Sequence, residues 1–161
     1  MSVTKLADDA VRLLKEKGLK VSFAESCTGG MLSAAVTSVD GASEVLDMSI
    51  VTYANWAKIK YTDVTEEVLE DITKGAVSEQ TASMMAAGIR KTSGADVGVG
   101  VTGIAGPGGG SPRKPVGTIY IAIDLENSHT VRHFSFTGNR NEVRTQTTEQ
   151  ALLMLVNCIK L

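Results

Sequence analysis

The fold is decided by the stretch KVSFAESCTGG at positions 20–30. Its first five residues combine apolar and β-forming types, which predict a short strand. The small residues that follow predict a turn, and a helix is expected from about Met31 to Ser38. A strand that leads through a small-residue turn into a helix is typical of α/β domains, in which helices pack on a sheet.

The flanking sequence continues this alternation of helices and strands. An amphipathic helix is expected within residues 1–20, and further helices are expected from Thr65 to Gly75, after Ser78 and from about 141 to 159. Further strands are expected at 48–53, 95–101, 118–124 and 131–136, the last two as an antiparallel pair. We therefore predict an α/β fold, a single domain over residues 1–161 with a mixed β-sheet flanked by helices on both faces.

Composition and charge narrow the function classes. A formal net charge of -2 provides no general attraction to nucleic acid or anionic membranes. No apolar run is long enough to span a bilayer, and the charged residues within 1–20 do not fit a signal peptide. Cys27 and Cys158 share no C-x-x-C spacing, which favours reduced thiols. We therefore expect a cytoplasmic protein that binds neither nucleic acid nor membranes.

Two familiar motifs are rejected because their context is wrong. Gly98 to Gly103 matches the dinucleotide pattern G-x-G-x-x-G, but its first two glycines fall inside a predicted strand rather than in a turn before a helix. His129 and His133 have the spacing of zinc ligands on a helix, but they fall in a strand pattern, where positions i and i+4 lie far apart. We therefore expect no dinucleotide cofactor and no metal.

The turn after the first strand is the first candidate for chemistry. Ser26 is expected beside backbone N–H groups that lack helical partners, and such groups favour an oxyanion or a phosphate. The alternative is a structural turn, with a Ser or Thr helix cap and glycines for close packing. Cys27 is a rival nucleophile, for which the alternative is a small buried thiol.

A serine nucleophile needs a base, and the segment YANWAK at 53–58 offers one. This segment leaves the end of a predicted strand and brings Tyr53, Asn55 and Lys58 together. A lysine acts as a base where burial or neighbouring cations lower its pKa. The alternative is an ordinary surface loop with a solvated Lys58 and a packed Trp56.

Glycine-rich and basic segments complete the candidate site. The segment TGIAGPGG at 102–109 follows a buried strand, where α/β sheets place ligands, and its backbone can approach a ligand closely. Arg113 and Lys114 form a basic patch, and Arg140 stands at a strand-to-helix junction, so each could meet a phosphate. The alternatives are a flexible linker, a solvated turn and an exposed charge.

Taken together, these segments resemble the CinA C-terminal-domain family, which includes standalone nicotinamide-nucleotide amidases. The matching blocks occur in family order over nearly the whole chain: AESCTGG at 24–30, YANWAK at 53–58, TGIAGPGG at 102–109, KPVG at 114–117 and GNR at 138–140. The chain departs from the family pattern at Trp56, where an acidic or polar residue is usual, and at Asn139, where Asp is common.

The resemblance implies hydrolysis of nicotinamide mononucleotide to nicotinate mononucleotide and ammonia by a homo-oligomer without a cofactor. It implies Ser26 as nucleophile, Lys58 as general base and Tyr53 as a residue that assists the pair. The residues assigned to the substrate site are Cys27, Thr28, Gly29, Gly30, Asn55, Thr102, Gly103, Gly106, Gly108, Lys114 and Arg140. The alternatives are a nucleotide-binding module without catalysis and an amidase for another small carboxamide.

Overall fold

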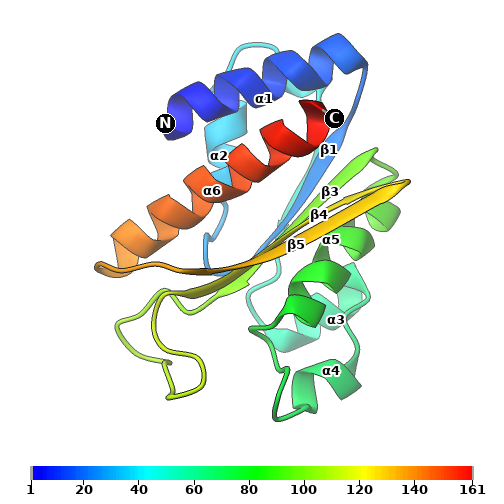
Figure 1. The fold of residues 1–161 in the computed structure, drawn as a ribbon. Helices are drawn as coiled ribbons and strands as arrows, with labels where there is room; N and C mark the ends of the chain where they lie inside the picture. The colour runs from blue at the N-terminus through cyan, green and yellow to red at the C-terminus, as the bar shows by residue number, and fades with distance from the viewer. Residues whose placement is uncertain (1, 161) are drawn as a thin grey trace.

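A five-stranded sheet in the order β2-β1-β3-β4-β5 forms the centre of the computed structural model, which describes residues 2–160 (Figure 1). Strand β1 pairs in parallel with both of its neighbours, whereas β4 is antiparallel to β3 and to β5. The strands are β1 (Val21–Glu25), β2 (Leu46–Val51), β3 (Val97–Gly103), β4 (Thr118–Leu125) and β5 (Ser128–Ser135). The mixed sheet and its late antiparallel pair confirm the predicted fold class.

Helices cover both faces of this sheet, as predicted (Figure 1). One face carries α1 (Val3–Lys17), α2 (Met31–Thr37) and α6 (Arg140–Lys160). The opposite face carries α3 (Asn55–Thr62), α4 (Glu66–Glu70) and α5 (Glu79–Ser93). A short 3-10 turn, η1 (Ala42–Glu44), precedes β2.

Most of the hydrophobic core lies on the α1, α2 and α6 side of the sheet. Phe23, Leu32, Ile121 and Leu152 are fully buried in this cluster. A smaller cluster on the other side contains Met85 from α5 and other buried residues. Burial of apolar side chains against both faces is what holds the helices to the sheet.

Helix α5 packs very close to strand β3 because β3 carries glycine at the positions where a side chain would collide with the backbone of the helix. A Cβ atom added at Gly98 would lie 2.0 Å from the Ala86 carbonyl oxygen, and one at Gly100 would lie 2.4 Å from that of Ala82. Both glycines lie inside β3. This confirms the prediction that they belong to a strand, on which the dinucleotide motif was excluded. Their role is therefore close helix-on-sheet packing.

Two expectations about helices need correction. Residues 53–58 do not form only a loop, because α3 begins at Asn55 and continues to Thr62. Helix α4 ends at Glu70 and not at Gly75, since residues 71–78 form turns and bends before the next helix. The predicted start of α5 is confirmed by Ser78, whose Oγ accepts a hydrogen bond from the Thr81 N–H at 3.1 Å.

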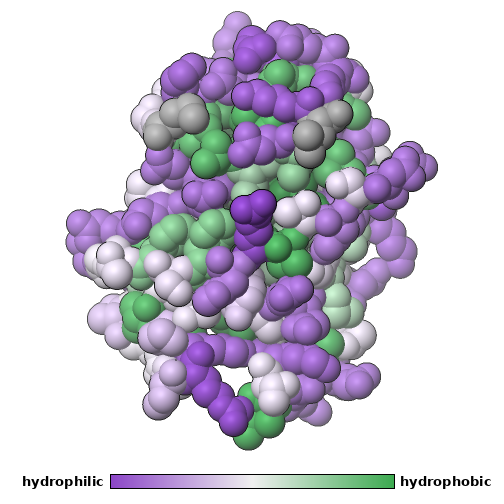
Figure 2. Space-filling view, in the orientation of Figure 1, coloured by the Kyte–Doolittle hydropathy of each residue, from purple (hydrophilic) through white to green (hydrophobic). Residues whose placement is uncertain are grey.

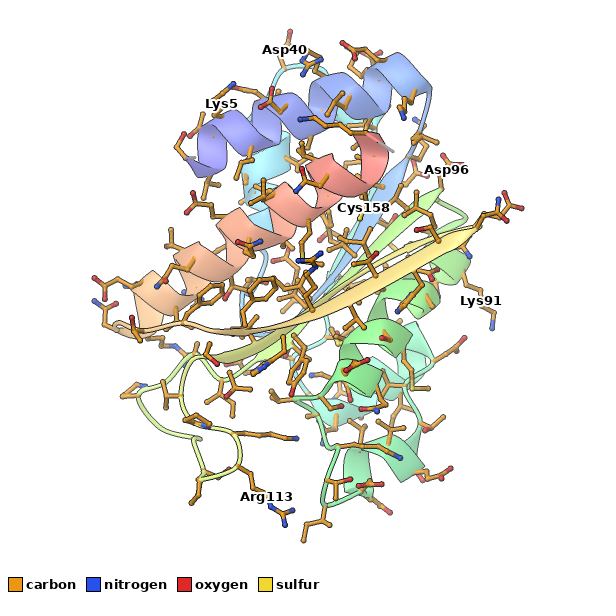
Figure 3. All side chains as sticks on the ribbon, in the orientation of Figure 1. Lys5, Asp40, Lys91, Asp96, Arg113 and Cys158 are labelled. Carbon is orange, nitrogen blue, oxygen red and sulfur yellow. The ribbon has the colours of Figure 1, made fainter. Side chains whose placement is uncertain are left out.

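The face shown in Figure 2 is dominated by hydrophilic residues, with smaller hydrophobic areas between them. Within residues 2–160, no helix combines the length and the apolar character needed to cross a bilayer. Both cysteines are free thiols: Cys27 is buried, and Cys158 lies on α6 (Figure 3).

Candidate active site

The candidate site lies where three parallel strands end. Because β2, β1 and β3 run in the same direction, their carboxyl ends meet at one edge of the sheet. In α/β sheets this edge is the usual position for a ligand. The segments that leave it are 26–30 after β1, 52–54 after β2 and 104–117 after β3. The predicted blocks therefore come together in space.

A buried carboxylate organises the turn after β1. The side chain of Glu25 is fully buried and accepts hydrogen bonds from the N–H groups of Gly30, Leu32 and Ser33, each at 3.1 Å. These are the N–H groups at the start of α2 that have no helical partner. A negative charge at this end of a helix is also favoured by the helix dipole. The chain therefore supplies its own anion to the N-terminus of α2.

This arrangement narrows the predicted oxyanion site to two donors. The Ser26 N–H donates to the Val101 carbonyl oxygen at 3.0 Å, and the Gly29 N–H donates to the Ser26 carbonyl oxygen at 3.1 Å. Among residues 2–160, no other residue accepts a hydrogen bond from the N–H group of Cys27 or of Thr28. These two N–H groups are therefore the donors of the turn that have no acceptor on another residue.

Lys58 is the strongest chemical feature of the site. It lies on α3, yet its side chain is only 1% exposed. Its Nζ donates to the carbonyl oxygens of Thr52 at 2.7 Å and Tyr53 at 3.1 Å, and it lies 3.2 Å from Ser26 Oγ. Burial lowers the pKa of Lys58 to about 8, since the charged ammonium loses its hydration.

These contacts suit a lysine that accepts a proton from serine. A neutral amine has two N–H bonds and one lone pair. The carbonyl oxygens of Thr52 and Tyr53 take the two N–H bonds, which leaves the lone pair for the Ser26 hydroxyl. Ser26 is itself buried, with 8% of its surface exposed. The predicted nucleophile and base are within hydrogen-bond reach of each other.

Cys27 is poorly suited to be the nucleophile. Its side chain is 4% exposed, and burial raises the pKa of the thiol to about 12. The reactive form of cysteine is the thiolate, which this environment disfavours. The structure thus favours the alternative of a buried thiol for Cys27.

Two arginines on α6 tie the loops of the site together. Arg140 Nη1 donates to the Gly106 carbonyl oxygen at 2.6 Å, and its Nη2 donates to the Tyr53 hydroxyl at 3.0 Å. One turn later, Arg144 Nε and Nη2 donate to the carbonyl oxygens of Cys27 and Thr28, each at 3.0 Å. Sequence reasoning identified Arg140 but missed Arg144. Their i, i+4 spacing on the same helix was the available signal.

The remaining predicted residues lie around this centre with different partners. Thr102 Oγ1 donates to the Ala76 carbonyl oxygen at 2.7 Å, and the Lys114 ammonium donates to the Lys74 carbonyl oxygen. Both contacts fasten β3 and the loop after it to segment 71–78. Arg113 extends from the tip of that loop, away from the rest of the molecule (Figure 3). Asn55 is exposed at the start of α3.

A second chain of hydrogen bonds resembles a catalytic triad but lacks an oxyanion site. His129 Nε2 lies 3.0 Å from Ser83 Oγ, and its Nδ1 lies 2.9 Å from Asp124 Oδ1. Arg90 binds the other Asp124 oxygen at 2.6 Å. Ser83 lies inside α5, where backbone N–H groups donate within the helix and cannot hold an oxyanion. We therefore interpret this network as a tie between α5 and the β4–β5 pair.

The fold and the site together define an α/β protein with a buried serine–lysine pair at the carboxyl ends of its parallel strands. Residues 3–159 match the family model described as the CinA C-terminal domain, so the chain belongs to this family. The family membership confirms the resemblance inferred from the motifs.

Relatives and solved structures agree with this assignment. The chain is 45% identical to a CinA-like protein of Thermotoga maritima over 97% of its own length and 38% of that protein. It is also 45% identical to a CinA-like protein of Dictyoglomus turgidum, over 94% of its own length and 36% of that protein. The chain thus spans little more than a third of these curated relatives.

Among solved structures, the competence/damage inducible protein CihA from Agrobacterium tumefaciens superimposes with a TM-score of 0.94 at 41% identity, covering 99% of this chain and 96% of that one. A CinA superfamily protein from Klebsiella pneumoniae 700603 also has a TM-score of 0.94, at 31% identity, covering 99% of both chains.

Proposed function

We propose that this protein is an amidohydrolase that converts nicotinamide mononucleotide to nicotinate mononucleotide and ammonia. The observation that carries the proposal is the environment of the Lys58 amine. It is buried, it is held by two carbonyl oxygens, and it faces the Ser26 hydroxyl at 3.2 Å. The choice of substrate rests on the resemblance of the motifs to nicotinamide-nucleotide amidases.

The first half of the reaction forms an acyl-enzyme. Neutral Lys58 takes the Ser26 proton as Oγ bonds to the carboxamide carbon, and the carbonyl oxygen becomes an oxyanion. The N–H groups of Cys27 and Thr28, which have no acceptor on another residue, lie in the turn that contains Ser26 and would hold this oxyanion. When the oxyanion collapses, the C–N bond breaks and the nitrogen leaves as ammonia with a proton from Lys58.

The second half releases the acid. Water attacks the ester carbon and gives a proton to Lys58. The ester carbonyl oxygen then becomes a second oxyanion. Collapse of this oxyanion breaks the bond to Oγ, and Lys58 returns the proton to Ser26. The product leaves as the carboxylic acid, which gives its proton to water and becomes the nicotinate carboxylate, and the enzyme regains its starting state. Every proton transfer in this scheme uses only Ser26, Lys58, substrate and water.

The nucleotide portion of the substrate would lie toward Arg140. A guanidinium has five N–H donors, and the contacts of Arg140 with Gly106 and Tyr53 use two of them. The remaining donors are free to bind a phosphate in the planar geometry that arginine favours. In this proposal Tyr53 assists from both ends, since its carbonyl oxygen holds Lys58 and its hydroxyl orients Arg140.

The test is ammonia release from nicotinamide mononucleotide by the wild type, Ser26→Ala and Lys58→Ala. Each variant should lose at least about 100–1000-fold in rate, the usual cost of losing even one oxyanion donor. Lys60→Ala, an exposed position on the same helix, is the matched control and should keep wild-type activity. Near-wild-type turnover by Ser26→Ala contradicts the mechanism.

Two other outcomes identify the rival functions. Binding of the nucleotide by the wild type without ammonia release would indicate a nucleotide-binding module without catalysis. Release of ammonia from a different small carboxamide, found with a substrate panel, would keep the serine–lysine chemistry and replace the substrate.

A further inference from the structure

The guanidinium of Arg144 binds the turn that carries the nucleophile from its carbonyl side. It is half-buried on α6, and its Nε and Nη2 each lie 3.0 Å from a carbonyl oxygen, those of Cys27 and Thr28. It also lies close to Gly29, where an added Cβ would lie 3.3 Å from Nη2. The guanidinium therefore sits directly against the backbone of residues 27–29.

The peptide chemistry links this contact to the oxyanion donors. The Cys27 carbonyl and the Thr28 N–H belong to the same peptide unit, and the two groups point in opposite directions because the unit is planar and trans. A cation on the carbonyl oxygen draws electron density from the nitrogen and strengthens the N–H as a donor. Arg144 thus acts on the Thr28 N–H, one of the two donors left free in the turn.

The charge balance of the turn points the same way. Glu25 is fully buried in this turn, so a negative charge already lies close to where a negative oxyanion would form. Arg144 supplies a positive charge to the same turn through the carbonyl oxygens of Cys27 and Thr28. Its charge also favours the ionised form of the neighbouring Cys27 thiol, although burial keeps the pKa of that thiol raised.

We propose that Arg144 is a positioning residue for the oxyanion, which fixes and polarises the Cys27–Thr28 peptide so that the Thr28 N–H stabilises negative charge on the substrate oxygen. This inference rests on the proposed serine hydrolase chemistry. It assigns Arg144 a role in the transition state and none in recognition of the nucleotide, which is the role of Arg140.

The expected kinetic effect is selective. Arg144→Met should lower kcat by about 10–100-fold, somewhat less than the loss of a whole oxyanion donor, because the N–H remains but is less polarised. KM for nicotinamide mononucleotide should change by less than about threefold, since the interaction strengthens only in the transition state. Arg144→Lys, which keeps the charge but not the two-pronged contact, should recover part of the lost rate.

A second measurement does not depend on the substrate. A fluorophosphonate probe phosphonylates an activated serine, and its phosphoryl oxygen gains charge in the transition state as a carboxamide oxygen does. The rate of Ser26 labelling, followed by peptide mass spectrometry, should fall about 10-fold or more in Arg144→Met and partly recover in Arg144→Lys. Arg132→Met, an exposed arginine on β5, is the control and should label at the wild-type rate.

The outcomes separate the two proposals. Wild-type labelling and kcat in folded Arg144→Met, or an effect on KM alone, overturns the role of Arg144. A wild type that releases no ammonia, but labels at Ser26 in an Arg144-dependent way, overturns the assigned substrate and supports Arg144. A wild type that neither releases ammonia nor labels at Ser26 overturns both. If Arg144→Met does not fold, the same comparisons are made with Arg144→Lys and Arg144→Gln.

Discussion

Lys58 Nζ lies 3.2 Å from Ser26 Oγ, although 32 positions separate the two residues in the chain. Their meeting follows from the parallel pairing of β1 and β2, which brings the turn after β1 next to the start of α3. Two further contacts, with the carbonyl oxygens of Thr52 and Tyr53, hold the amine in place. The pair is therefore built into the fold, before any substrate binds.

The pKa of Lys58 predicts how activity depends on pH. Burial lowers this pKa to about 8, and in the proposed mechanism the base is the neutral amine, which gains population as the pH rises. We expect kcat/KM to rise by about tenfold per pH unit below this value and to level off above it. Steady-state kinetics between pH 6 and 10 measure the profile, and the residual activity of Lys58→Ala should lack this step. A wild-type profile that is flat across pH 8 contradicts the assignment of Lys58 as the base.

The same shift predicts a pH-dependent stability. The pKa of Lys58 is about 8 in the folded chain and 10.5 for an unperturbed lysine, so between these values the unfolded chain binds more protons. Stability therefore rises with pH in this window. The free energy of unfolding of the wild type should increase, relative to that of Lys58→Met, by about 1 kcal/mol per pH unit between pH 8 and 10. Urea unfolding at several pH values measures the difference.

Lys60→Met provides the matched control for this stability measurement. Lys60 is exposed on the same helix, so its replacement should shift stability by an amount that does not change between pH 8 and 10. The idea fails if the difference between wild type and Lys58→Met stays constant over the same range.

The glycines of β3 predict a packing effect that has no connection with nucleotide binding. In Gly100→Ala the new methyl group would lie 2.4 Å from the Ala82 carbonyl oxygen and 2.6 Å from the Ala86 nitrogen. Because both atoms belong to the backbone of α5, the helix must move, at a cost of about 2–3 kcal/mol. Gly108→Ala, where nothing lies within 4 Å of the added Cβ, should cost much less. Thermal unfolding of both variants compares them, and equal losses would contradict the packing role.

The fold and the motif blocks of the site could be predicted from the sequence because both depend on local patterns. The turn at 26–30 and the strand containing Gly98 can both be found from residue types alone. Helix α3 was missed because its pattern is reversed: Lys58 is buried, whereas Trp56 is 63% exposed and Tyr61 is 38% exposed. Apolar periodicity cannot find a helix whose most buried long side chain is charged.

The contacts of Glu25 and Arg144 could not be predicted for a different reason. Both side chains bind backbone groups, and a backbone N–H or carbonyl leaves no trace in the residue type that carries it. Glu25 directly before Ser26 was visible as a charge, but its capture of the α2 N-terminus depends on the turn between them. Such contacts become visible only with the backbone in place.

In the proposed function, Arg140 binds the substrate phosphate. A hydrogen bond to a charged group is worth about 1.5–3 kcal/mol, so Arg140→Met should raise KM for nicotinamide mononucleotide about 10–100-fold. Nicotinamide riboside has the same carboxamide and no phosphate, so its KM should rise by less than about threefold in Arg140→Met. Tyr53→Phe removes the hydroxyl that accepts a hydrogen bond from Arg140 Nη2 at 3.0 Å. This variant should raise KM by a smaller factor, and again more for the mononucleotide than for the riboside.

The comparison of the two substrates decides what Arg140 does. Arg140 also holds the glycine loop through the Gly106 carbonyl oxygen, so its loss could disturb the site without any phosphate being involved. If the glycine loop merely becomes disordered, binding of both substrates weakens equally, because the carboxamide must still be placed against Ser26. A loss confined to the phosphorylated substrate can arise only from a contact with the phosphate. Equal losses for the mononucleotide and the riboside would thus remove Arg140 from the phosphate site and leave it as a tie between α6, Gly106 and Tyr53.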